Sequence, residues 1–199
     1  MSTPHPMSRH LATMAYNNAW SNHRLLSACA QLSPAEFAAP RTGFFPSIRA
    51  TLNHIVTVDK FYMDALAREA RGEPPHPDYV ASFFTPAEPY DACAPLQQAQ
   101  RAVDRQLIDY CLALRDDDLA RTVTILRRDG PQSETRMRLL NHVFQHQTHH
   151  RGQVHAMLSG TPVAPPQLDE FFCAMDAPLR EREFAELGFS ETAIWGPPA

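Results

Sequence analysis

Five of the ten histidines fall within fourteen residues, between His142 and His155. Imidazole nitrogens are common protein ligands for divalent transition metals. Two histidines four positions apart lie one above the other on a helix and can hold one ion between them. His146 and His150 have this spacing. The segment therefore predicts a metal site, provided that it is helical and that these two side chains face the interior.

The apolar residues around these histidines recur with helical spacing and indicate which rings face inward. A helix advances about 100° per residue. On that projection His150 falls about 30° from the centre of the apolar residues and His146 about 70°. His142, His149 and His155 fall roughly 110° or more away, toward a flank or solvent. We therefore predict that His146 and His150 are the inward pair.

The pair alone leaves alternatives open. A buried histidine can be a packing residue that is hydrogen-bonded to a carbonyl group, with no metal nearby. A catalytic zinc ion usually has three protein ligands and one water, so a third ligand must come from elsewhere. Gln147 stands where the glutamate of an H-E-x-x-H motif would be. An amide cannot accept a proton as a carboxylate does, which argues against classical metalloprotease chemistry.

Four long amphipathic helices are predicted to position these residues. They cover residues 8–31, 47–71, 91–115 and 138–159. Ser47 is placed to cap the second helix and Gly72 to end it. Two short β-prone runs around Asp129-Gly130 predict a hairpin between the third and fourth helices. Four helices with few strands predict an all-α four-helix bundle, whose core is a common place for metal sites.

The remaining segments are connections and a C-terminal extension. Residues 72–89 contain five prolines and are predicted to form a long loop. The chain beyond residue 160 is predicted to wrap around the bundle and to end in a short helix. Length and composition predict one domain over residues 1–199, with no internal repeat.

The composition excludes several classes of partner. The 199-residue chain has a net charge of −4, so no basic surface is expected to bind nucleic acid. The sequence contains no long apolar run of the kind that forms a membrane span or a secretory signal. We therefore expect a cytoplasmic protein. The four cysteines form no C-x-x-C pair and are predicted to be reduced thiols.

The second helix supplies one histidine, His54, and a carboxylate in an unusual place. His54 projects about 120° from the apolar centre, which fits either a neighbouring helix or solvent. Asp59 projects within roughly 20° of that centre, and a buried carboxylate needs a partner. It could orient a ligand or pair with an arginine. Arg151 is in turn predicted to pair with a carboxylate, and Gly152 to allow a close approach by another helix.

Three pieces of the chain, in order, resemble the DinB family of damage-inducible, metal-binding four-helix bundles. The second and third pieces are the more specific. The pieces are Tyr16-Asn17-x-x-Trp20-x-Asn22-x-Arg24-Leu25, Phe45-Pro-Ser47-Ile48-x-x-Thr51-Leu52-Asn53-His54-Ile55-x-x-x-Asp59 and Leu140-x-His142-Val-Phe-x-His146-Gln-x-His149-His150-Arg151-Gly152-Gln153.

The resemblance implies a metal triad of His54, His146 and His150. The helical projection selects the last two independently, whereas His54 depends mainly on the resemblance. Three neutral imidazoles around a divalent ion leave a doubly positive site with an open position, which acidifies a bound water or holds a thiolate. No catalytic side chain is identified.

The family likeness also carries expectations about activity. It implies a metal-dependent hydrolase or thiol transferase, with zinc or nickel as the ion and a low-molecular-weight thiol as a potential cofactor. A homodimer is expected on the same ground, and the small-molecule substrate is not identified. The alternatives are a non-catalytic metal-binding module that acts in a stress response or an interaction, and a metal-free bundle whose histidines only pack.

Overall fold

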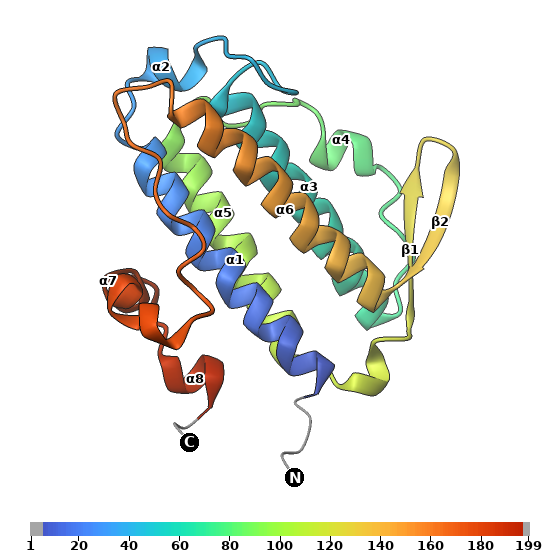
Figure 1. The fold of residues 1–199 in the computed structure, drawn as a ribbon. Coiled ribbons are helices and arrows are strands. Elements are labelled where there is room, and N and C mark those ends of the chain that lie inside the picture. Colours follow the sequence, from blue (N-terminus) through green and yellow to red (C-terminus); the bar gives the residue numbers. More distant parts are fainter. Residues whose placement is uncertain (1–5, 197–199) are drawn as a thin grey trace.

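Four long helices form a bundle in the computed structural model, which describes residues 6–196 (Figure 1). They are α1 (Met7–Cys29), α3 (Ile48–Arg71), α5 (Cys93–Ala113) and α6 (Arg136–Leu158). Helices α1 and α6 run in one direction, and α3 and α5 run in the other (Figure 1). The predicted four-helix bundle is therefore confirmed, with each helix end within two residues of its predicted position.

Capping side chains explain where these helices begin and end. The Ser47 hydroxyl accepts a hydrogen bond from the backbone N–H of Ala50 at 3.0 Å and starts α3. Gly72 ends that helix in the left-handed conformation, with φ of 71°. Thr135 accepts from the backbone N–H of Arg138, which starts α6 two residues earlier than predicted. The side-chain cap at Thr135 thus starts α6 before the apolar pattern of that helix begins.

The connections between the long helices contain several shorter elements, among them a single 3-10 turn at Asp116–Asp118. Helix α2 (Pro34–Ala38) lies between α1 and α3. The connection from α3 to α5 runs back along the bundle because these helices are parallel, and it contains α4 (Tyr79–Phe83) where only a loop was predicted (Figure 1). Strands β1 (Thr122–Arg127) and β2 (Gly130–Thr135) form the predicted antiparallel hairpin.

The main core lies between the four long helices. Leu11, Ile55, Leu66 and Leu140 come from three of these helices and are almost completely buried. Burying one such side chain contributes roughly 1.5–3 kcal/mol. None of the helices in residues 6–196 combines the length and apolar character needed to cross a membrane.

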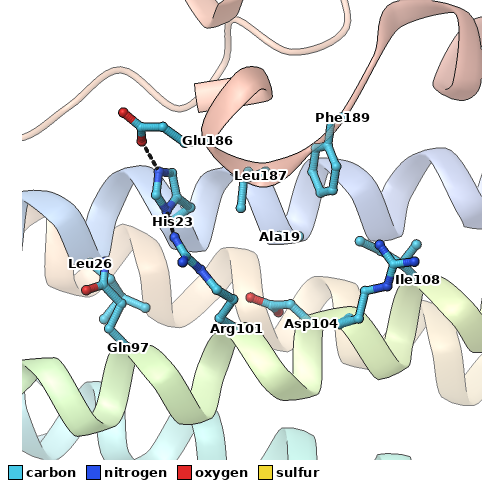
Figure 2. Close-up of a pocket in the computed structure, with 11 residues that line it drawn as sticks. Ala19, His23, Leu26, Gln97, Arg101, Asp104, Ile108, Glu186, Leu187 and Phe189 are labelled. Atoms are coloured by element: carbon cyan, nitrogen blue, oxygen red, sulfur yellow. Dashed lines mark hydrogen bonds and ion pairs between the residues drawn. The ribbon is translucent and has the colours of Figure 1, made fainter. Parts of the chain in front are cut away.

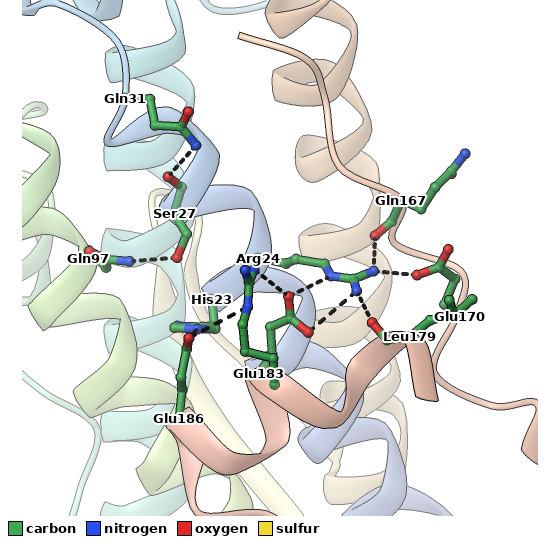
Figure 3. Close-up of polar contacts among 11 residues, drawn as sticks. His23, Arg24, Ser27, Gln31, Gln97, Gln167, Glu170, Leu179, Glu183 and Glu186 are labelled. Atoms are coloured by element: carbon green, nitrogen blue, oxygen red, sulfur yellow. Dashed lines mark hydrogen bonds and ion pairs between the residues drawn. The ribbon is translucent and has the colours of Figure 1, made fainter. Parts of the chain in front are cut away.

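The C-terminal extension, residues 161–196, packs against the outer side of α1 (Figure 1). It contains two short helices rather than the one predicted, α7 (Ala177–Leu187) and α8 (Glu191–Trp195). A second apolar cluster joins it to the bundle through Trp20, Phe171, Phe184 and Ile194. Figure 3 shows Arg24 of α1 donating hydrogen bonds to Glu170, at 2.6 Å, and to the backbone oxygen of Gln167, at 2.9 Å. Apolar and polar contacts therefore both fix the extension to α1.

Candidate metal centre

Three histidine rings converge between α3 and α6. His54 comes from the first half of α3, His146 from the middle of α6 and His150 from its second half. One ring nitrogen of each lies within 4.8 Å of the other two. The Nε2 atoms of His54 and His146 are 3.0 Å apart. Because α3 and α6 are antiparallel neighbours, residues distant in sequence meet here at the same level of the bundle (Figure 1).

The spacing of these nitrogens fits a first-row divalent ion. Nitrogen ligands of zinc lie about 2.0–2.1 Å from the metal, so two ligands of a tetrahedral ion are roughly 3.3 Å apart. The separations in the cluster, from 3.0 Å to at most 4.8 Å, bracket that value. The side chains present could therefore hold an ion without rearrangement of the helices.

The surroundings of the cluster keep its histidines neutral. Burial, followed by the nearby His150, lowers the pKa of His54 from 6.5 to about 4. Burial and the neighbouring histidines lower the pKa of His146 to about 3. Burial also lowers the pKa of His150, against the effect of a hydrogen bond from that ring to Gln153. A metal ligand must present an unprotonated nitrogen, and at neutral pH all three rings do.

Gln153 orients one of the rings and was not singled out from the sequence. Its Oε1 atom is 2.8 Å from Nδ1 of His150, so that nitrogen carries the hydrogen and Nε2 keeps its lone pair. The amide nitrogen of Gln153 is 3.1 Å from Nε2 of His149. The signal that could have found it is its position one helical turn beyond His150.

Aromatic rings flank the cluster on both sides. The Phe45 ring centroid lies 4.4 Å from that of His54 and 5.6 Å from that of His150. On the other side the ring of His142 is 6.1 Å from that of His146 and 5.2 Å from that of Tyr62. His142 and His149 are exposed, as predicted, and neither belongs to the converging set.

Asp59 belongs to a separate buried network beside the histidines. Its Oδ2 atom accepts a hydrogen bond from Gln100 at 2.8 Å and another from Gln147. Gln100 also donates to Asp104, which accepts from Asn22 at 2.9 Å. Burial and the nearby Asp104 raise the pKa of Asp59 to about 8, and burial raises that of Asp104 to about 6. Asp59 thus bonds to side-chain amides. Within the described part of the chain it neither orients a histidine nor pairs directly with an arginine.

Two predictions about α6 are wrong. Arg151 was expected to pair with a carboxylate, but its guanidinium donates to the amide oxygens of Asn18, Asn22 and Gln147. These amides stand between the arginine and the acids. Gly152 was expected to admit another helix, yet a Cβ there would meet no atom within 4 Å. The residue is exposed, so packing does not explain it.

Comparisons with known proteins agree with this architecture. The model of the DinB family matches residues 7–183. The chain belongs to the DinB family. A crystal structure of a DinB-like protein from Bacillus cereus superposes with a TM-score of 0.56 at 16% identity, covering 76% of this chain and 91% of that one. At that identity the likeness of the two DinB proteins supports the fold alone. No curated protein matches the chain.

Proposed function

We propose that this DinB protein is a metal-dependent enzyme whose divalent ion, zinc or nickel, is held by His54, His146 and His150. The observation that carries the proposal is the convergence of three neutral imidazoles from two helices within 4.8 Å. Family membership supports it, because the matched span includes all three residues. Buried polar atoms normally have a bonding partner, and one cation would serve as the partner of a ring nitrogen from each of the three histidines.

The bound ion would lower the pKa of water or a thiol and so supply a nucleophile at neutral pH. A cysteine-like thiol has a pKa of about 8.5 and free water is far less acidic, so the pKa of a thiol needs a much smaller shift. The three proposed ligands are uncharged and leave the full double positive charge to stabilise an anion. A three-histidine site can also bring a bound water to a pKa of about 7, so the donor set suits thiol transfer and hydrolysis alike, and turnover assays decide between them.

Neighbouring side chains would prepare the site for this chemistry. Gln153 holds His150 in the tautomer that presents Nε2. Phe45 covers the ring of His54 and restricts water on that side. Partial burial, followed by the nearby Arg127, lowers the pKa of His142, so this partly exposed ring is neutral at pH 7 and able to accept a proton. These residues position the ligands or take up protons.

Metal analysis of the purified chain tests the ligand set. We expect about one divalent ion per chain. His54→Ala, His146→Ala and His150→Ala should each remove the metal, because two remaining nitrogens hold an ion poorly. His149→Ala is the matched control on the same helix and should retain it. Loss of metal in His149→Ala alone would show that the ligand set is wrong.

Turnover assays then separate an enzyme from a binding module. The metal-loaded protein is assayed with glutathione or cysteine plus an electrophile, and in parallel with ester and amide panels. Thiol-dependent turnover that disappears in the three alanine variants supports the proposal. Activity with esters or amides alone would assign a hydrolase. Stoichiometric metal with no turnover in any panel would favour the non-catalytic alternative.

A further inference from the structure

A cavity lies between the bundle and the C-terminal extension, and none of the three clustered histidines lines it. It has a volume of about 270 Å³ and is bordered by α1, α5 and the end of α7 (Figure 2). Most of its wall is apolar and includes Ala19, Leu26, Ile108, Leu187 and Phe189. Its size is close to the lower end of the range for small-molecule sites, about 300–1,000 Å³.

The extension builds the outer wall of this cavity. Gly188 ends α7 with φ of 69°, which lets the backbone N–H of Phe189 bond to the oxygen of Phe184 at 2.8 Å. The Phe189 ring then packs edge-on against Tyr16, with 4.9 Å between centroids. Leu187 and Phe189 lie beyond residue 183, where the family match ends. The outer wall is therefore an addition to the matched part of the chain.

The polar end of the cavity is formed by His23, Arg101 and Glu186 (Figure 2). Arg101 Nη2 is 3.0 Å from Nδ1 of His23 and can only donate, so this nitrogen accepts. Nε2 of His23 therefore carries the hydrogen and donates to Glu186 at 2.7 Å.

Arg101 contributes a positive charge that no acid in the described part of the chain neutralises by an ion pair. The carboxylates that border the cavity already interact with groups other than Arg101. Glu186 accepts from His23 and lies 3.7 Å from Arg182, and Asp104 accepts from three buried amides. Arg105, the other arginine of the wall, pairs with Asp109 at 3.1 Å. The unpaired guanidinium is therefore the group at this end able to receive an anion.

We propose that this cavity binds a small monocarboxylate with an apolar body, its carboxylate on Arg101 and its hydrocarbon part against Leu187 and Phe189. A guanidinium matches the two oxygens of a carboxylate, and an apolar wall matches an alkyl or aryl chain. This site is separate from the histidine cluster and does not depend on the proposed function. The C-terminal extension gives the protein a ligand site of its own.

Isothermal titration calorimetry of the full chain with octanoate tests the proposal, with octan-1-ol as the uncharged analogue. We expect saturable binding of octanoate with about one site per chain, and weaker binding of the alcohol. Arg101→Gln should weaken octanoate binding about tenfold or more, because a charge-assisted hydrogen bond is lost. Phe189→Ala should weaken both ligands, because the apolar wall is shortened.

Two control variants localise the binding. Arg128→Gln removes an exposed arginine in the turn of the hairpin and should leave the affinity for octanoate unchanged. His146→Ala should also leave it unchanged, since that residue belongs to the histidine cluster. Circular dichroism checks that each variant is folded.

Three results would overturn the proposal. They are the absence of octanoate binding to the wild-type chain, equal affinities for octanoate and octanol, and loss of octanoate binding in His146→Ala with retention in Arg101→Gln. The last result would place the carboxylate at the histidine cluster. Failure of the metal assay has no bearing on these outcomes, so the two proposals fail separately.

Discussion

Two groups of polar side chains lie side by side inside the bundle, and they are built in opposite ways. His146 and His150 contribute to the histidine cluster, while Gln147 and Arg151, the residues that follow them, enter the buried network with Asp59. The histidine cluster brings together nitrogens that present lone pairs. The network joins amide and guanidinium donors to carboxylate and amide oxygens. One helix thus supports both groups through adjacent residues.

This difference identifies the buried network as a structural framework and the histidine cluster as the candidate ligand site. In the network, the carboxylates of Asp59 and Asp104 and the guanidinium of Arg151 all have hydrogen-bond partners. Two buried oxygens, Oδ1 of Asp59 and Oε1 of Gln100, have no hydrogen-bond partner within residues 6–196. The raised pKa of Asp59 favours a proton on its carboxyl group at neutral pH, which supplies a donor there. In the histidine cluster the Nε2 atoms of His54 and His146 lie 3.0 Å apart, and the proposed cation would bind their lone pairs.

The largest expected effect comes from breaking the network. Arg151→Met removes the donor to Asn18, Asn22 and Gln147 and should lower the free energy of unfolding by about 3–5 kcal/mol, because each buried amide oxygen left unpaired costs about 1–3 kcal/mol. Urea denaturation of metal-free protein measures this. His146→Ala should cost less stability in the same assay while abolishing metal binding. Equal stability of Arg151→Met and wild type would mean that the network is not a framework.

A smaller effect is expected from loosening the histidine cluster without removing a ligand. Gln153→Met takes away the acceptor that orients His150 and should weaken metal binding roughly 10–100-fold. Competition with a chromogenic chelator gives the affinity. Gln145→Met is the matched control, because Gln145 is exposed on the same helix. An unchanged affinity in Gln153→Met would show that packing alone orients the ring.

The smallest effect is a pH dependence whose sign differs between the two groups. The lowered pKa values of His54 and His146 mean that the unfolded chain binds more protons below 6.5, so their contribution to stability falls as pH drops from 6.5 toward 4. The raised pKa of Asp59 means that the folded chain binds more protons, so its contribution falls as pH rises from 3.8 toward 8.

Urea unfolding of metal-free protein from pH 5 to pH 8 checks these signs. Above pH 6.5 the loss of stability with rising pH should come mainly from Asp59, and Asp59→Asn should reduce it. His146→Ala should reduce the loss on the acid side instead. A decline above pH 6.5 that persists unchanged in Asp59→Asn would contradict the proposed protonation of that carboxyl group.

Periodicity predicted the bundle and two of the three histidines of the cluster, because a helix fixes which side chains share a face. The inward placement of His150 and the exposure of His142 and His149 follow from α6 alone. His54 could not be placed in this way, since it lies on a flank of α3 whose neighbour depends on how the helices pack. The family resemblance supplied what the single helix could not.

The errors arise where long-range partners decide the outcome. Two of the three acceptors of Arg151 are amides on α1, more than a hundred positions away, and no local pattern distinguishes them from a carboxylate. The cavity beneath the C-terminal extension was not predicted at all. Its polar end joins His23, Arg101 and Glu186 from three helices, and only the docking of α7 brings them together.

The sequence separation of the two helices that meet at the histidine cluster has a mechanical consequence. His54 and His146 are 92 positions apart. An ion shared between them would act as a removable crosslink, tying an early helix to a late one and restricting the unfolded chain as a disulfide bond does. Any compound that strips the ion would then loosen the pairing of α3 with α6, so the supply of metal would set the heat resistance of the bundle.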